Sequence, residues 1–303
     1  MSGAALERVR LRDGRALVVK RVTPATDLTL GLTGGAVAGE FLLWRSGALD
    51  LLPPGVGHAV VDGWLEGDTT VLVMRDLGDT MLTWDDRLST ARCRWMVDRI
   101  AALHQRFLDD PPVAVVPLEP VLGLFAPTRI ARLAGENELI AAALRGWEYF
   151  PDHVPVDVAE PVLTLLEDPR ALAAALKACP VTLVHGDLAT VNMAVDGDDL
   201  VLIDWAMPTA APGALDIARF LVGCASVVEP TREQVIERYA RAAGPAYDAT
   251  AMRLSLLAAL VWLGWNKALD IVESSDEAFR DRERADLDWW VSEARKTLET
   301  GAL

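Results

Sequence analysis

The sequence predicts an α+β fold for this 303-residue chain, from three observations. Short segments of alternating or β-branched apolar residues, typical of strands, gather in the first quarter of the chain. Long amphipathic segments, typical of helices, fill most of the rest. A further pair of short strands, at 193–195 and 200–203, interrupts these helices. We therefore expect a small antiparallel sheet followed by a mainly helical region.

Two hairpins account for the expected N-terminal sheet. Residues 6–11 and 16–22 alternate in polarity or are apolar, and an Asp-Gly turn joins them. Residues 59–64 and 69–74 form a second pair around a glycine-containing turn.

Lys20 is the unusual residue of this sheet, because it is the only lysine before Lys177. An ammonium group on a sheet suits phosphate oxygens, whereas the plain alternative is a surface lysine at a strand end. The next segment, 23–35, contains glycines and is expected to be loosely structured. A helix over 36–49 follows, with Glu40 in its first turns, where an ordinary solvated glutamate is the plain alternative.

The helical region begins at Ser89 or Thr90, which are suitable N-caps for a helix over 91–107. His104 on this helix is expected to have a structural role. Residues 109–125 are proline-interrupted and expected to be extended. Further helices are expected over 127–144, 158–178, 214–221, 231–242, 249–272 and 276–298, with residues 147–156 separating the first two.

The most informative stretch begins with a short β-branched run at 181–184, which is expected to be a strand. It delivers His185, Gly186 and Asp187 into a loop, and Asn192 follows five residues after the aspartate.

The hairpin over 193–203 leads to a geometric prediction. Asn192 precedes its first strand and Asp204 follows its second, so antiparallel pairing brings these two side chains together. One amide oxygen and one carboxylate suit a hard cation such as Mg²⁺. Asp187 lies close enough on the same loop to accept a proton from a hydroxyl. These groups fit phosphoryl transfer to an alcohol.

His185-Gly-Asp187 with Asn192, followed by Ile203-Asp-Trp205, closely resembles the catalytic and metal motifs of aminoglycoside phosphotransferases and the related choline kinases. These are small-molecule kinases with a two-lobed protein-kinase-like fold. The resemblance implies a nucleotide-binding N-terminal lobe at 1–77, abbreviated at its start. A catalytic and acceptor-binding lobe would cover 78–303.

The same resemblance implies a role for each matching residue. Asp187 would be catalytic, and Asn192 and Asp204 would hold Mg²⁺. Lys20 would bind the phosphates of ATP or another nucleoside triphosphate, and Glu40 would orient Lys20.

Supporting positions are implied in the same way. His185 and Asp216 would brace the catalytic loop. Met74, Asp76 and Leu77 would border the adenine at the hinge, with backbone groups making the hydrogen bonds.

One departure from the family concerns the N-terminus. The family has a strand and a phosphate-covering loop before the first strand seen here, where only residues 1–5 stand. Three explanations of this short N-terminus are an abbreviated lid, a start further upstream and impaired nucleotide binding. The alternative function is therefore a catalytically impaired kinase-like protein that binds a nucleotide or another ligand.

The acceptor is open at this stage. The resemblance places its pocket among the helices of 127–178 and the C-terminal helices, but the fold does not name the substrate. An aminoglycoside, another amino sugar, an amino alcohol, a related metabolite and an uncharged alcohol all remain candidates.

Composition narrows the partners. A formal charge of −15 and a pI near 4.7 argue against nucleic acid or an anionic membrane as partner, and would attract a cationic acceptor, although solubility explains the acidity equally well. No window holds 18 uninterrupted apolar residues, so no membrane span is expected. Cys93, Cys179 and Cys224 are scattered, which favours the cytoplasm. The oligomeric state is left open.

Overall fold

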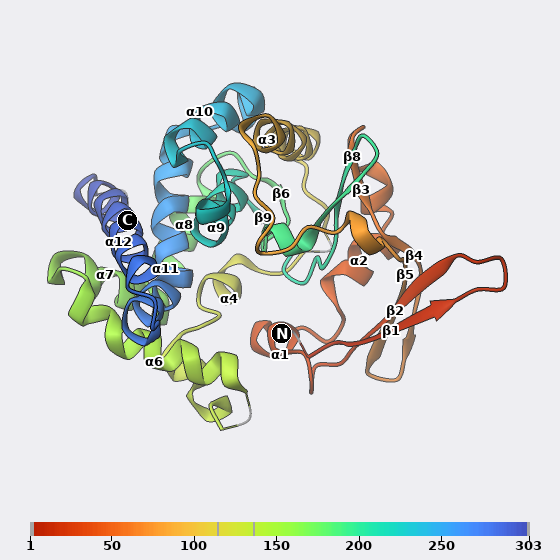
Figure 1. Ribbon diagram of the computed structural model, residues 1–303, viewed down its shortest axis with the longest axis horizontal. Coiled ribbons are helices and arrows are strands. Elements are labelled where there is room, and N and C mark those ends of the chain that lie inside the picture. The colour runs from red at the N-terminus through yellow and green to blue at the C-terminus, as the bar shows by residue number, and fades with distance from the viewer. Residues whose placement is uncertain (1–2, 114, 136, 302–303) are drawn as a thin grey trace. The chain divides into compact units, whose positions relative to one another are not determined.

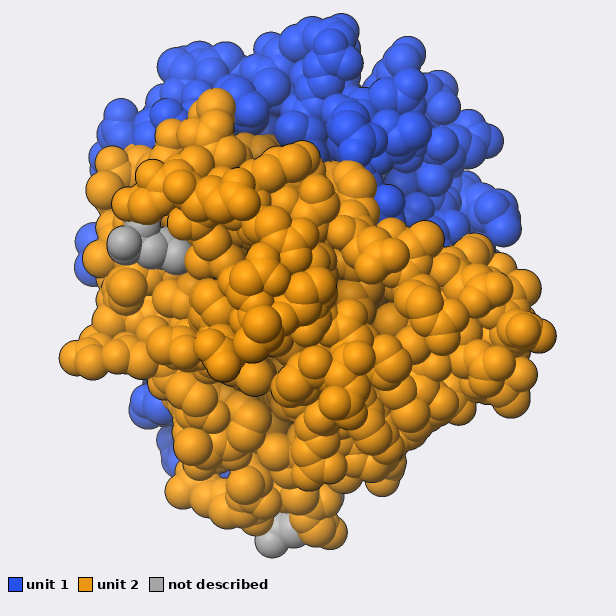
Figure 2. Space-filling model, turned by 90° about the vertical axis from the view of Figure 1, so that its left-hand side faces the viewer, with its two compact units in different colours: residues 1–117, 180–248 blue, residues 118–179, 249–303 orange. Residues whose placement is uncertain are grey.

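The computed structural model describes residues 3–113, 115–135 and 137–301 (Figure 1). The chain forms two compact units, coloured separately in Figure 2. Unit 1 comprises residues 1–117 and 180–248, and unit 2 comprises residues 118–179 and 249–303. The α+β prediction is confirmed, because the sheets all lie in unit 1 and helices form most of the remaining structure. The predicted lobe boundary at residues 77 and 78 lies inside unit 1. The assignment of nucleotide binding to one lobe and of catalysis and acceptor binding to the other stays a prediction.

The largest sheet contains the four strands expected from the two hairpins. Its order is β1 (Ala5–Arg10), β2 (Ala16–Val22), β5 (Thr69–Arg75) and β4 (Val60–Glu66), and every neighbouring pair is antiparallel. Lys20 lies opposite Leu72 of the central strand β5. The lysine is therefore on an interior strand and is buried, in contrast to the surface alternative.

Two smaller sheets surround the motif region. The predicted hairpin is β7 (Met193–Asp196) paired antiparallel with β8 (Asp199–Leu202), and β3 (Val56–His58) adds to β8 in parallel. The strand before the loop, β6 (Thr182–Val184), pairs with β9 (Thr209–Ala211). Neither β3 nor β9 was expected, because Val56–His58 and Thr209–Ala211 lack the run of β-branched and apolar residues that predicted β6.

The helices of unit 1 are α1 (Leu28–Thr33), α2 (Gly39–Arg45), α3 (Thr90–Arg106), α9 (Ala214–Cys224) and α10 (Arg232–Ala243), with 3₁₀ turns at Ala48–Leu51, Gly78–Thr80, Thr190–Asn192, Ala225–Val227 and Gly244–Ala246. The expectation that 23–35 is loosely structured was wrong. Asp27 accepts a hydrogen bond from the backbone N–H of Leu30 and so caps α1, which buries Leu30 and Leu32.

Unit 2 consists of the helices α4 (Leu118–Leu122), α5 (Pro127–Ile130), α6 (Glu138–His153), α7 (Val156–Glu167), α8 (Arg170–Lys177), α11 (Ala249–Glu273) and α12 (Glu277–Glu299), with a 3₁₀ turn at Ala131–Leu133. Four expectations were wrong here. Residues 147–153 continue α6 because Trp147 and Phe150 are buried on its apolar face, and the proline-interrupted stretch 109–125 contains the short helix α4. The single helix expected over 127–144 is broken into α5, the 3₁₀ turn and α6, and the one expected over 158–178 is broken at Pro169 into α7 and α8.

Among the residues that the structure describes, α11 alone has the length and mean hydropathy, 1.3, of a membrane span. Its apolar window is 67% buried within the protein, and the helix packs against α6 and α12. Trp262 and Trp265 are among its buried side chains. We therefore regard α11 as the central, buried helix of unit 2.

Candidate active site

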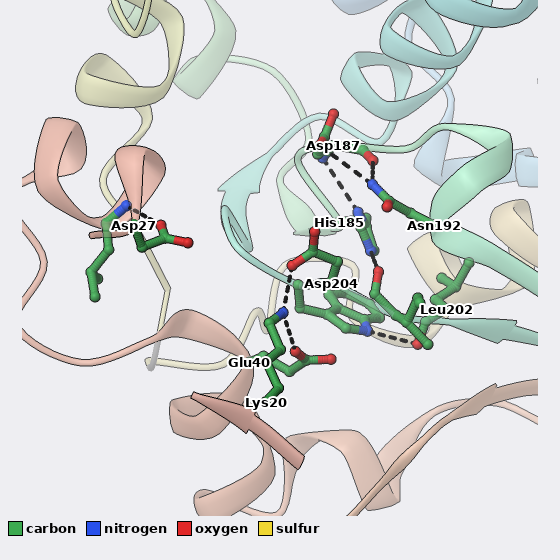
Figure 3. Close-up of polar contacts among 11 residues, drawn as sticks. Lys20, Asp27, Glu40, His185, Asp187, Asn192, Leu202 and Asp204 are labelled. Carbon is green, nitrogen blue, oxygen red and sulfur yellow. Dashed lines mark hydrogen bonds and ion pairs between the residues drawn. The ribbon is translucent and has the colours of Figure 1, made fainter. Parts of the chain in front are cut away.

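Three elements of unit 1 bring Lys20, Glu40 and Asp204 into contact, and we call these residues the Lys20 cluster. The Nζ of Lys20 on β2 lies 3.0 Å from Oε2 of Glu40 on α2 and 2.5 Å from Oδ1 of Asp204 after β8 (Figure 3). Lys20 and Glu40 are 8% and 2% exposed, whereas the Asp204 side chain is 31% exposed. The cluster is therefore closed on the lysine side and accessible at one carboxylate.

Close approach of α2 to the loop after Asp204 makes this contact possible. A Cβ on Gly39 would lie 2.6 Å from Cδ of Pro208 and 3.1 Å from the carbonyl oxygen of Trp205. The backbone N–H of Ala38 donates to the hydroxyl of Thr70 on β5, at 3.2 Å. A glycine is thus required immediately before the glutamate that holds the lysine.

Electrostatics keeps Lys20 and Asp204 charged. Burial alone would lower the pKa of Lys20, but the carboxylates of Glu40 and Asp204 outweigh it, so the pKa is raised. Burial acts to raise the pKa of Asp204, and the Lys20 ammonium more than reverses this effect. Asp204 is therefore ionised, and its negative charge stabilises a neighbouring cation.

A buried carboxylate, Asp216, holds the loop that carries Asp187. Its Oδ2 accepts from the backbone N–H of His185 at 2.8 Å, and its Oδ1 accepts from that of Gly186 at 2.9 Å. His104 Nε2 lies 3.1 Å from Oδ2, and His104 Nδ1 lies 2.9 Å from the hydroxyl of Tyr239. Burial would raise the pKa of Asp216, but these hydrogen bonds, the one from His104 foremost, lower it. Asp216 thus holds the backbone at the start of the loop, as the predicted bracing role requires.

Gly186 is the position in this loop that no other residue can fill. Its φ is +84°, and a Cβ there would lie 1.9 Å from the carbonyl oxygen of Met207. Both the left-handed backbone and the close approach exclude a side chain.

His185 uses both ring nitrogens to tie the loop together. Its Nε2 donates to the carbonyl oxygen of Ile203 at 2.9 Å, and its Nδ1 accepts from the backbone N–H of Asp187 at 3.3 Å. The ring also packs against Trp205, with centroids 4.6 Å apart. With both nitrogens engaged, the histidine is suited to shaping the loop rather than to proton transfer.

The paired strands β7 and β8 place Asn192 as predicted, at the open end of the hairpin. The backbone N–H of Ile203 donates to the carbonyl oxygen of Asn192 at 3.0 Å, which continues the ladder up to the residue before Asp204. Asn192 Nδ2 donates to the backbone oxygen of Asp187 at 2.8 Å and to its Oδ2 at 3.3 Å (Figure 3). Because the amide nitrogen is committed to Asp187, the amide oxygen is the atom that can coordinate a metal.

The predicted ligands are of the kind that Mg²⁺ prefers. Asp204 would contribute a carboxylate that already has a cationic neighbour, and Asn192 would contribute a neutral oxygen. In the described part of the chain, no group of three or more His, Cys, Asp or Glu side chains is suited to a metal. Mg²⁺ commonly takes only one or two protein ligands and completes its shell with water and phosphate oxygens.

Asp204 has an uncommon backbone conformation. Its φ is +58°, and the backbone N–H of Ala206 donates to its carbonyl oxygen at 2.7 Å, which makes a tight turn directly after β8. Only Asp109 shares a positive φ among the described residues other than glycine. Such conformations concentrate at functional sites, where the surrounding structure holds them.

The predicted hinge residues lie at the end of β5. Met74 is buried, the carboxylate of Asp76 forms an ion pair with Arg8, and Asp76 Oδ1 also accepts from the backbone N–H of Gly78 at 3.0 Å. Leu77 follows at the start of the next turn. Their contact with an adenine stays a prediction.

Sequence reasoning missed Arg219. Its Nε and one terminal nitrogen lie 2.9 and 2.7 Å from Oδ1 of Asp187, the predicted catalytic carboxylate. The available signal was its spacing, since Arg219 follows Asp216 by three residues on α9, which places both on one helical face.

The chain is similar to known proteins in sequence and in structure. The sequence profile described as the phosphotransferase enzyme family matches residues 47–253, and no curated protein matches the chain. The structure of a choline/ethanolamine kinase family protein from Mesorhizobium loti is 16% identical, with a TM-score of 0.53, over 99% of this chain and 94% of that one.

Two aminoglycoside phosphotransferase structures are also similar. APH(3'')-Id from Streptomyces rimosus, in complex with ADP and streptomycin, is 19% identical with a TM-score of 0.48, over 86% of this chain and 93% of that one. The enzyme from Alicyclobacillus acidocaldarius is 19% identical with a TM-score of 0.46, over 98% and 90%.

The likeness to the Mesorhizobium loti structure confirms the expected kinase-like fold. The family profile covers more than half of the chain and includes the loop at Asp187, the turn at Asp204 and the brace at Asp216. On this evidence the protein belongs to the phosphotransferase enzyme family.

Proposed function

We propose that this protein transfers the terminal phosphoryl group of a nucleoside triphosphate, ATP in the first instance, to a hydroxyl group of a small molecule. One observation supports the proposal: Lys20 contacts Glu40 and Asp204, and His185 ties the loop of Asp187 and Asn192 to Ile203, the residue before Asp204. These are the groups that phosphoryl transfer requires for phosphate binding, metal binding and acceptor activation.

On the donor side, Lys20 binds the phosphate oxygens. An ammonium has three N–H donors, and Glu40 and Asp204 accept from two of them. The third is free to donate to a phosphate. Asn192 and Asp204 would hold Mg²⁺, which when bound neutralises charge on the phosphate oxygens.

On the acceptor side, Asp187 orients the hydroxyl and accepts its proton. The acceptor oxygen forms a bond to the terminal phosphorus while the bond from that phosphorus to the leaving nucleoside diphosphate breaks. The Asp187 side chain is 29% exposed, so an acceptor can reach it. His185 and Asp216 keep the loop in place during this step.

We extend the proposal to acceptors that carry an amine. The net charge of −15 favours the approach of cations. The name of the Mesorhizobium loti protein adds choline and ethanolamine to the candidates, beside aminoglycosides and amino sugars. A cytoplasmic location stays a prediction from the cysteine pattern.

The test is a screen for phosphorylated product by mass spectrometry with ATP and Mg²⁺, across aminoglycosides, amino alcohols and neutral sugars. The wild-type protein should phosphorylate at least one acceptor. Asp187→Asn should lower the rate about 10³-fold, within the usual range for loss of a general base, and retain the wild-type melting temperature. Retained activity in Asp187→Asn contradicts the assigned role.

Calorimetry distinguishes the proposal from the alternative of an impaired binding protein. Nucleotide binding without transfer to any acceptor or to water supports the impaired protein. An absence of heat at millimolar ATP with Mg²⁺ contradicts the proposed kinase.

A further inference from the structure

We propose that Arg219 is a positioning residue that fixes the catalytic carboxylate of Asp187, and that Gly223 makes room for it. The inference rests on the proposed function and adds a residue that the motifs do not contain. Arg219 acts through Asp187.

The contact geometry supports this role. Both Nε and a terminal nitrogen of Arg219 lie within 2.9 Å of Oδ1 of Asp187. Asn192 Nδ2 approaches the other oxygen, Oδ2, at 3.3 Å. One oxygen is thus held firmly by a planar guanidinium, and the other is held only weakly and is the oxygen presented to an acceptor hydroxyl.

Burial indicates that the arginine is part of the site's framework. The Arg219 side chain is 11% exposed, compared with 29% for Asp187. Arg219 approaches from α9, one turn after Asp216, which holds the backbone of the same loop. One helical face therefore fixes both the main chain and the side chain of the catalytic loop.

Gly223 lies one further turn along this face of α9. A Cβ at that position would lie 2.5 Å from a terminal nitrogen of Arg219. The obstructed atom is the end of a flexible side chain, so an alanine would displace the guanidinium without obstructing the backbone. Gly223→Ala thus perturbs the contact while Arg219 is retained.

The experiment uses the full chain with ATP, Mg²⁺ and water as the acceptor, so that no substrate needs to be known. Arg219→Ala should lower kcat for ATP hydrolysis about 10²-fold, because small misplacement of a reacting group has effects of this size. The KM for ATP should stay unchanged, because Arg219 holds Asp187, which is assigned to the acceptor and not to the nucleotide phosphates. Arg219→Lys and Gly223→Ala should each lower kcat about 10-fold, since a lysine cannot reproduce the planar fork.

Chemical rescue provides a readout that a purely structural role would not give. Millimolar guanidinium chloride should restore part of kcat in Arg219→Ala, and equal sodium chloride should not. Gly57→Ala, whose Cβ would lie at an ordinary 3.5 Å from Val201, and Arg238→Lys, which alters the ion pair with Asp98, are the matched controls. If Arg219→Ala fails to fold, the kcat values of Arg219→Lys and Gly223→Ala still test the role of Arg219.

A wild-type kcat in Arg219→Ala, or a loss of kcat with a matching rise in KM and no rescue, overturns the role of Arg219 alone. A wild-type protein that neither hydrolyses ATP nor phosphorylates any acceptor overturns the proposed function, and this inference with it.

Discussion

Both units bury a lysine between two carboxylates, and the two clusters differ in how open they are. In unit 2, Lys267 Nζ lies 2.8 Å from Oε2 of Glu283 and 2.8 Å from Oδ2 of Asp286, which we call the Lys267 cluster. Its three side chains are 8–11% exposed. The Lys20 cluster of unit 1 has similar distances, but its Asp204 side chain is 31% exposed.

The origin of the residues differs as well. The Lys267 cluster joins two consecutive helices, α11 and α12, whereas the Lys20 cluster joins a strand, a helix and a strained turn. In unit 1 a further acid, Asp187, stands on the loop before Asn192, and its side chain is 29% exposed. Ion pairing alone therefore does not identify an active site. The accessible carboxylate of Asp204 is what makes the Lys20 cluster the candidate site.

Removing one carboxylate from each cluster should separate the two roles most strongly. Asp204→Asn should lower phosphoryl transfer about 10³-fold, because a metal ligand contributes several kcal/mol and each 1.36 kcal/mol is tenfold. Asp286→Asn should leave kcat within about twofold of wild type. Steady-state kinetics with saturating Mg²⁺ and ATP provide the measurement, and equal losses in both variants would remove the functional distinction between the clusters.

Replacing the lysines should give the opposite order when stability is measured in place of activity, with the larger effect in the Lys267 cluster. Lys267→Met leaves two buried carboxylates without their cation and should lower the free energy of unfolding by about 3–5 kcal/mol. Lys20→Met should cost less stability, because Asp204 can be hydrated, but should abolish transfer. Urea denaturation followed by circular dichroism measures the first effect.

A control for the lysine comparison replaces the whole closed cluster. The triple variant Lys267→Met, Glu283→Leu and Asp286→Leu should be as stable as wild type, or more stable, since apolar packing commonly matches a buried ion pair. A triple variant less stable than Lys267→Met would show that the acids contribute something other than pairing.

Asp270, near the Lys267 cluster, gives the smallest expected effect. Burial, and then the charge of Glu283, raises its pKa from the ordinary 3.8 to about 6. Between these values the folded protein binds a proton that the unfolded chain has lost, so stability falls as the pH rises through this window. The effect is fully developed above pH 6.

Asp270→Asn should therefore raise the free energy of unfolding by about 1 kcal/mol at pH 8, after allowance for solvent screening of this half-buried group, and should change little at pH 4. Melting temperatures of the variant and wild type at both pH values test this. The exposed Asp288→Asn on α12 controls for loss of a surface charge. An equal gain at both pH values would contradict the explanation.

Local pattern was sufficient for several features of the fold and site. Alternation and turn residues predicted all four strands of the main sheet and the hairpin that pairs Asn192 with the residue before Asp204. It was insufficient for α1, where the cap at Asp27 and the burial of Leu30 decide the structure. Residues 147–153 were also misjudged, because the burial that extends α6 depends on packing within unit 2.

By itself, the sequence determined what lies within one hairpin or one helix. It gave the polar residues at the ends of the strands, the spacing from His185 to Asn192, and the family whose motifs have this spacing. Tertiary structure alone decided the contacts of Lys20 with Asp204, 184 positions away, and of Arg219 with Asp187. Periodicity reports which face of an element is buried, but not which other element covers it. The partner of a buried charge is set by packing, and the chain's two lysine clusters differ in exposure for that reason.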